Sequence, residues 1–88
     1  MPYRVTRYEE TPNPNALKCI LDRAISDHPK SFRSPDAAAG DALAESLFAV
    51  DGVAVIYMNA DWMTINKAPA ASWKSVKSGV ERVLSQAP

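Results

Sequence analysis

One continuous stretch, residues 43–67, constrains the fold of this 88-residue chain more than any other part. It begins with large apolar residues at the spacing of one helical face, at Leu43, Leu47, Phe48 and Val50. Asp51 and Gly52 then end the helix, because glycine reaches the left-handed conformation without a Cβ clash. Residues 53–58 are apolar at almost every position, which predicts a strand covered on at least one side.

The same stretch closes with a reversal and a second strand. Residues 59–61 have the composition of a turn. The strand after them alternates, with Met63 and Ile65 on one face and Trp62, Thr64 and Asn66 on the other. This two-residue period indicates a strand over 62–67 with one buried face.

The N-terminal residues predict two further strands, over Tyr3–Glu9 and Ala16–Asp22. In the second of them, one face carries Leu17, Cys19 and Leu21 and the other carries Ala16, Lys18 and Ile20. The loop between the strands reads TPNPN, residues 11–15. Its two prolines restrict their neighbours to extended conformations and remove two backbone donors, so we expect a stiff loop and a wide hairpin connection.

The first helix has two candidate starting points. Residues 23–35 are polar and contain two prolines, so we expect an irregular loop that crosses the sheet. The helix begins either with Ser34 as cap and Pro35 at its first position, or later with Asp41 as cap. A glycine between the two caps weakens a continuous helix by about 1 kcal/mol relative to alanine, so the helix is expected over residues 41–49.

A second helix is predicted from Trp73 to about Ser85, with Ser72 as its cap. Its apolar stripe comprises Trp73, Val76, Val80 and Val83, and Gly79 would allow a close approach to the sheet. The expected fold is therefore α+β with the order ββαββα. It has two layers: a mostly antiparallel, four-stranded sheet with two helices on one face, in a single domain over residues 1–88.

Composition excludes several classes of protein. Ten acidic and ten basic residues cancel without any run of like charge, so the basic excess typical of a nucleic-acid-binding protein is missing. Cys19 is the single cysteine, which excludes an internal disulfide. No run approaches the ~20 apolar residues of a membrane span and the first ten residues contain no apolar signal segment, so a soluble, cytoplasmic protein is expected.

Three segments together resemble a known family. TPNPNALKC, SLFAVDGVAVIYMNADWMTINK and SWKSVKSGVERVL, at residues 11–19, 46–67 and 72–84, are similar to the N-terminal domain of Nfu/NifU-type iron–sulfur cluster scaffold proteins. In that family, cluster binding belongs to a separate C-terminal domain with a Cys-x-x-Cys pair. The resemblance thus implies a stand-alone, non-enzymatic module that binds no cofactor by itself and contacts a protein partner, either an iron–sulfur carrier or a client.

Eight residues are the candidates for contact with that partner. On the stiff loop, Thr11, Asn13 and Asn15 offer a dense set of hydroxyl and amide groups. The other five are expected on the sheet face away from the helices: Lys18, Asp61, Trp62, Thr64 and Lys67. An aromatic residue beside a polar rim is typical of an interaction site, although a solvated sheet face and an ordinary turn explain the same patterns.

Two other functions compete with this hypothesis. A small redox or metal-handling protein would use Cys19, with or without His28, but a packed cysteine and an exposed histidine are the simpler interpretations. No second histidine or cysteine stands at metal-ligand spacing, and no catalytic residue is identified. A structural or regulatory adaptor outside iron–sulfur metabolism is the other alternative, since a fold does not determine a function. The sequence leaves the oligomeric state open.

Overall fold

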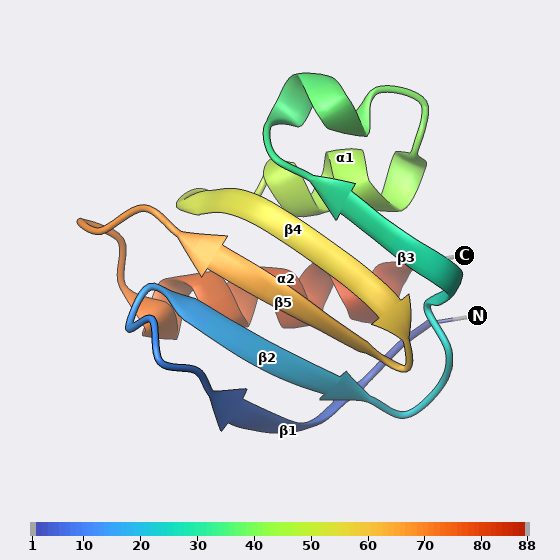
Figure 1. The fold of residues 1–88 in the computed structure, drawn as a ribbon, viewed down its shortest axis with the longest axis horizontal. Coiled ribbons are helices and arrows are strands. Elements are labelled where there is room, and N and C mark those ends of the chain that lie inside the picture. The colour runs from blue at the N-terminus through green and yellow to red at the C-terminus, as the bar shows by residue number, and fades with distance from the viewer. Residues whose placement is uncertain (1, 88) are drawn as a thin grey trace.

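The computed structural model describes residues 2–87. Its centre is one sheet of five strands in the order β1-β2-β5-β4-β3, and every neighbouring pair is antiparallel (Figure 1). The strands are β1 (Val5–Glu10), β2 (Ala16–Leu21), β3 (Ser26–Phe32), β4 (Val53–Ala60) and β5 (Trp62–Lys67). The expected α+β class and antiparallel pairing are confirmed, while the expected number of four strands is wrong.

The additional strand is β3, which lies where an irregular loop was expected. Its sequence is polar because it forms an edge of the sheet, with only β4 beside it. Pro29 is accommodated because the pairing register shifts between Ser26 and Lys30, and an edge strand tolerates a residue without a backbone donor. Phe32, paired with Ile56, anchors the end of the strand in the core.

Both residues proposed as caps of the first helix act as caps, but of two different elements. Ser34 accepts a hydrogen bond from the backbone of Ala37 and begins a short 3-10 helix, η1 (Pro35–Ala38). After Gly40, which has a φ of 92°, Asp41 caps α1 (Ala42–Phe48). The chain therefore breaks at the glycine, and the helix expected over residues 41–49 is confirmed with its flanking caps.

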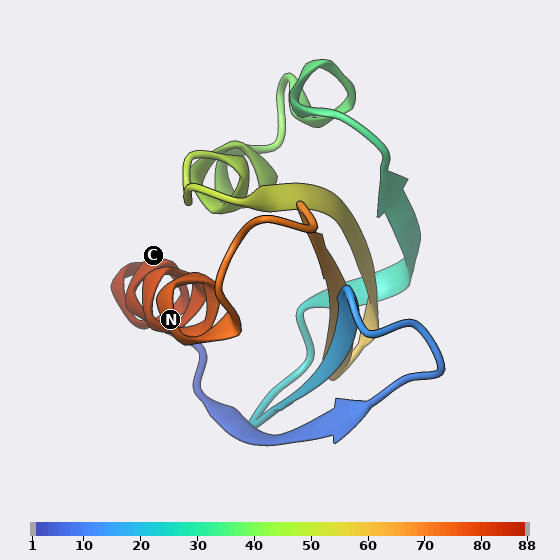
Figure 2. The ribbon, with the colours of Figure 1, turned by 90° about the vertical axis from the view of Figure 1, so that its left-hand side faces the viewer.

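The second helix, α2 (Trp73–Gln86), begins after the Ser72 cap as expected. Figure 2 shows α1 and α2 on the same side of the curved sheet. The buried residues of α2 are Val76, Val80 and Leu84, and they close the core against the inward side chains of the strands. These three residues of α2 are 0–2% exposed, which is the close packing of a protein interior.

Gly79 provides a close approach, but to a different element than expected. A Cβ built on Gly79 would lie 2.5 Å from Cγ1 of Val50, which lies two residues after the end of α1. The glycine therefore lets α2 approach the end of α1 rather than the sheet. Helix–helix contact decides this position because α1 and α2 lie side by side on the same face.

Candidate functional site

The face of the sheet away from the helices carries a cluster of partly exposed aromatic and cationic side chains. We call it the outer face and define it by six residues, two from each of β2, β4 and β5: Lys18, Ile20, Val55, Tyr57, Trp62 and Thr64. All six are half-buried, although no helix covers this side of the sheet. Side chains on neighbouring strands shield one another here, as cross-strand pairs do.

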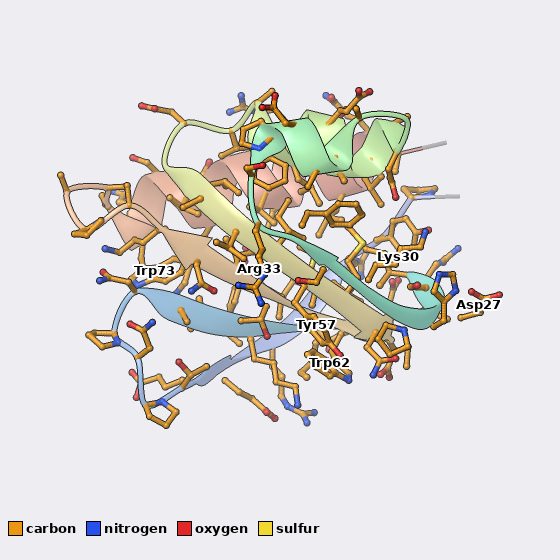
Figure 3. All side chains as sticks on the ribbon, turned by 45° about the horizontal axis from the view of Figure 1, so that its top comes forward. Asp27, Lys30, Arg33, Tyr57, Trp62 and Trp73 are labelled. Carbon is orange, nitrogen blue, oxygen red and sulfur yellow. The ribbon has the colours of Figure 1, made fainter. Side chains whose placement is uncertain are left out.

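Trp62 is the centre of the outer face. Its ring lies 5.4 Å from the ring of Tyr57 at a tilt of 40°, within the range of favourable aromatic pairs. The Lys18 ammonium lies 4.6 Å from the Trp62 ring centre, which is a cation–π geometry. Figure 3 shows Tyr57 and Trp62 next to each other at one end of β4 and β5. The site thus offers two joined aromatic surfaces with a cation above one of them.

An ion network from β1 extends this cluster. Glu9 accepts a hydrogen bond from Arg7 at 3.0 Å and lies 3.9 Å from the Lys18 ammonium. Both interactions are exposed to solvent, so each contributes little to stability. Lys18 therefore lies between Glu9 on β1 and the Trp62 ring on β5, and it contacts both.

The TPNPN loop uses its polar side chains internally. The Thr11 hydroxyl contacts Asn13 and Ala16 main-chain groups, and Oδ1 of Asn13 accepts a hydrogen bond from the backbone of Asn15. Oδ1 of Asn15 accepts a 2.9 Å hydrogen bond from the Lys67 ammonium. The side chains of these loop residues therefore stabilise the loop itself. What the loop offers to a partner is the rigid shape of its backbone.

Lys67 does not share the outer face with Lys18 and Thr64, contrary to the expectation. Thr64 and Lys67 are three residues apart on one strand, and the two-residue period of a strand places them on opposite faces. The Lys67 ammonium accordingly reaches the helix side, 5.7 Å from the ring of Trp73 at the start of α2. It contacts the loop and the helix, and so contributes to the join between them.

Asp61 lies apart from the other predicted residues. It occupies the turn between β4 and β5, at the opposite end of β5 from Lys67, and its side chain is exposed. Its carbonyl oxygen accepts a hydrogen bond from the backbone of Leu21. The eight candidates thus divide into a loop group with Lys67, an outer-face group of Lys18, Trp62 and Thr64, and the isolated Asp61.

Cys19 is packed in the core, with 2% of its surface exposed. Burial raises the pKa of its thiol to about 12, and the nearby Glu81 carboxylate adds to the effect. A thiol must lose its proton to act as nucleophile or metal ligand, so this environment opposes both roles.

The other metal-ligand candidate, His28, is exposed as expected and pairs only with Asp27, whose carboxylate lies 2.5 Å from Nδ1. The proximity of the imidazole lowers the pKa of Asp27. Among residues 2–87, no three His, Cys, Asp or Glu side chains gather closely enough to hold a metal ion. Within the same range, neither helix has the length and apolarity required to cross a membrane.

The sequence reasoning missed two residues of this face, Tyr57 and Arg33. Tyr57 belongs to a strand that is apolar at nearly every position, so its outward direction was not distinguished. The alternation relative to Ile56 would have indicated it. Arg33 follows Phe32, which points into the core, and therefore lies toward the outer side, where Figure 3 shows it near Tyr57. It could not be placed before β3 was known.

The chain matches the family model described as scaffold protein Nfu/NifU N terminal over residues 6–87. The chain belongs to this family. The matched range includes the Trp62 strand and the TPNPN loop, so the candidate residues of this Nfu N-terminal domain lie within the matched part of the chain.

Curated relatives agree with this assignment. The protein called NFU1 iron-sulfur cluster scaffold homolog, mitochondrial, of Drosophila ananassae is 35% identical over 78 residues, covering 86% of this chain and 27% of that protein. A NifU-like protein of Schizosaccharomyces pombe is 34% identical over 85 residues, covering 91% of this chain and 32% of that protein. This Nfu N-terminal domain therefore spans less than two thirds of the length of the curated relatives it matches.

Solved structures share the fold. The crystal structure of protein SAV1430 from Staphylococcus aureus superposes with a TM-score of 0.76 at 26% identity, covering 91% of this chain and 96% of that chain. A NifU-like protein from Saccharomyces cerevisiae gives a TM-score of 0.76 at 24% identity, covering 91% of this chain and 74% of that one. The five-stranded sheet with two helices is thus an established architecture.

Proposed function

We propose that this Nfu N-terminal domain is a non-catalytic protein-binding module that acts in the assembly or delivery of iron–sulfur clusters. Membership of a scaffold family supports the connection to cluster assembly. The observation that carries the binding role is the half-exposed Trp62–Tyr57 pair under the Lys18 ammonium. Tryptophan and tyrosine are enriched where protein interfaces concentrate their binding energy.

The chemistry of the chain favours binding over cluster carriage. A bridging cluster is held by several converging thiolates, and these 88 residues contain one cysteine, which is buried. We therefore propose that this chain binds no cofactor by itself. The buried thiol likewise argues against the alternative of a redox protein based on Cys19.

In this proposal, the partner docks on the outer face. Trp62 and Tyr57 supply apolar contact, and Lys18 and Thr64, which face each other across β2 and β5, supply polar contact. The TPNPN loop contributes a rigid, exposed edge at Pro12–Pro14, because its polar side chains are already paired within the loop.

Affinity purification from the native cell tests the proposal. Tagged wild-type chain is expected to co-purify proteins of iron–sulfur cluster biogenesis, and Trp62→Ala is expected to lose them. Lys74→Gln on α2, which removes an exposed cation from the opposite side of the molecule, is the matched control and should retain them. Circular dichroism confirms that each variant is folded.

The contradicting result is equally specific. Recovery of no iron–sulfur protein by the wild-type chain, together with normal activity of iron–sulfur enzymes in a deletion strain, refutes the proposal and favours an adaptor outside this metabolism. The cytoplasmic location expected from the sequence stays a prediction, which fractionation of the native cell tests.

A further inference from the structure

The outer face has a local excess of positive charge in a chain whose net charge is zero. Three basic side chains lie on it or at its rim: Arg7 from β1, Lys18 from β2 and Arg33 after β3. The acidic residue that faces them is Glu9, which already interacts with both Arg7 and Lys18. One carboxylate therefore serves two cations, and the face keeps an excess of two positive charges.

Arg33 is the least compensated of these cations. No ion pair among residues 2–87 involves it, and its side chain is exposed. In Figure 3 its guanidinium lies over the sheet on the side of Tyr57 and Trp62. A planar guanidinium with free donors is suited to a carboxylate, which it can bind through two parallel hydrogen bonds.

Lys18 and Arg33 flank the aromatic pair. Lys18 lies on β2, on one side of Trp62, and Arg33 follows β3, on the other side of Tyr57. An occupant that matches this order has negative groups at two points separated by an apolar part. An extended polypeptide has that arrangement when one of its faces reads acidic, apolar, acidic at positions i, i+2 and i+4, because residues two apart share a face. The carboxylates at i and i+4 then lie about 13 Å apart, close to the width of the three strand spacings between β2 and β3.

We propose that the outer face binds an acidic segment of the partner protein, with carboxylates on Lys18 and Arg33 and apolar side chains on Trp62 and Tyr57. This inference rests on the proposed function, because it names the chemistry of the partner that the module would bind. Charge complementarity of this kind selects the partner and accelerates the encounter.

Two other occupants match the face less well. A second copy of the chain in a two-fold dimer would place one positively charged outer face against an identical one. Single-stranded nucleic acid also uses aromatic and cationic side chains, but its binding depends on neutralising many phosphates. A face with an excess of two charges, on a chain of isoelectric point near 6.5, provides few such contacts.

Binding of synthetic peptides to the whole chain tests the inference. The probe is a fluorescein-labelled decapeptide with the repeat Glu-Ser-Leu-Ser, which places Glu and Leu in turn along one face of the extended chain, compared with peptides that carry Gln or Lys in place of Glu. We expect the Glu peptide to bind tightest, to lose affinity with added salt, and to shift the backbone amide resonances of β2, β4 and β5. Lys18→Gln with Arg33→Gln should weaken it about tenfold, while Lys74→Gln with Arg82→Gln on α2 should not.

Four results would overturn the inference: equal affinity for the Gln peptide, resonance shifts centred on α1 and α2, tighter binding of a ten-nucleotide deoxythymidine strand, or shifts explained by concentration-dependent dimerisation. Native purification separates this failure from that of the proposed function. If Lys18→Gln with Arg33→Gln retains the iron–sulfur partners that Trp62→Ala loses, the acidic partner segment is refuted and the docking module stands.

Discussion

The indole Nε1–H of Trp73 donates a 3.0 Å hydrogen bond to the carbonyl oxygen of Pro14, which lies 59 residues earlier in the chain. This bond joins the first residue of α2 to the TPNPN loop. The Lys67 ammonium lies at the same join, bonded to Asn15 and 5.7 Å from the Trp73 ring. Trp73, which the sequence placed in the apolar stripe of the helix, is half-exposed. Its indole links the loop to α2.

Trp73→Phe keeps the apolar ring and removes the donor to Pro14. We expect a loss of about 0.5–1 kcal/mol of unfolding free energy, because one solvent-accessible hydrogen bond is removed. The Ala16 amide, which donates to Asn13 within the loop, should exchange with solvent faster. Urea titration and hydrogen exchange measure the two effects. Trp62→Phe is the control, since the Trp62 indole makes no hydrogen bond among residues 2–87. Equal losses of unfolding free energy in both variants would contradict the role of the Trp73 hydrogen bond.

The buried thiol of Cys19 predicts a loss of stability at alkaline pH. Its pKa rises from 9.0 to about 12 on folding, so the unfolded chain loses the proton first as the pH increases. The stabilising contribution is complete below pH 9 and decreases by up to about 1.4 kcal/mol per pH unit between 9 and 12. Urea titrations at pH 8 and 10 should show a steeper decline for wild type than for Cys19→Ala. Parallel declines, or fast reaction of the native thiol with a disulfide reagent, would show that the thiol is not buried.

Gly79→Ala has opposite expected effects in two backgrounds. Alanine is the better helix former by about 1 kcal/mol, but its Cβ would lie 2.5 Å from Cγ1 of Val50. In the wild-type chain, we expect a net destabilisation of about 1–3 kcal/mol from overpacking. In a Val50→Ala chain, the obstacle is gone and the substitution should be neutral or stabilising. A thermodynamic cycle from urea titrations measures the change of sign, and additive effects would refute the contact.

Ala60 is a residue in a conformation better suited to glycine. Its φ is 52°, in the turn that joins β4 to β5, and a Cβ raises the energy of this left-handed conformation by about 1–2 kcal/mol. Ala60→Gly should therefore stabilise the chain by about 0.5–1 kcal/mol, less the entropy that glycine loses on folding. Ala54→Gly, at an exposed position of β4 whose backbone is not in the left-handed conformation, should destabilise instead. Thermal unfolding measures both changes, and effects of the same sign would contradict the explanation.

Local sequence patterns predicted the structure correctly wherever a short segment depends only on its own residues. Ser34, Asp41 and Ser72 each cap the element that their side chains predicted, because a cap depends only on the next two or three amides. The alternation of β5 likewise placed Met63 and Ile65 in the core and Trp62 outside. The failure at β3 has a physical cause, since an edge strand with one neighbour needs neither an apolar pattern nor a full set of backbone donors.

The sequence by itself determined the helices, their caps, four of the strands and the buried residues of β2 and β5, because these follow from short-range periodicity and backbone preferences. Only the tertiary structure decided that β2 lies beside β5, which places Lys18 against Thr64 and above Trp62 although 44 positions separate Lys18 from Trp62. It also decided that Arg33 reaches the same face and that Lys67 leaves it for the loop. Strand order results from the joint packing of all elements on one core, and no local stretch of residues encodes it.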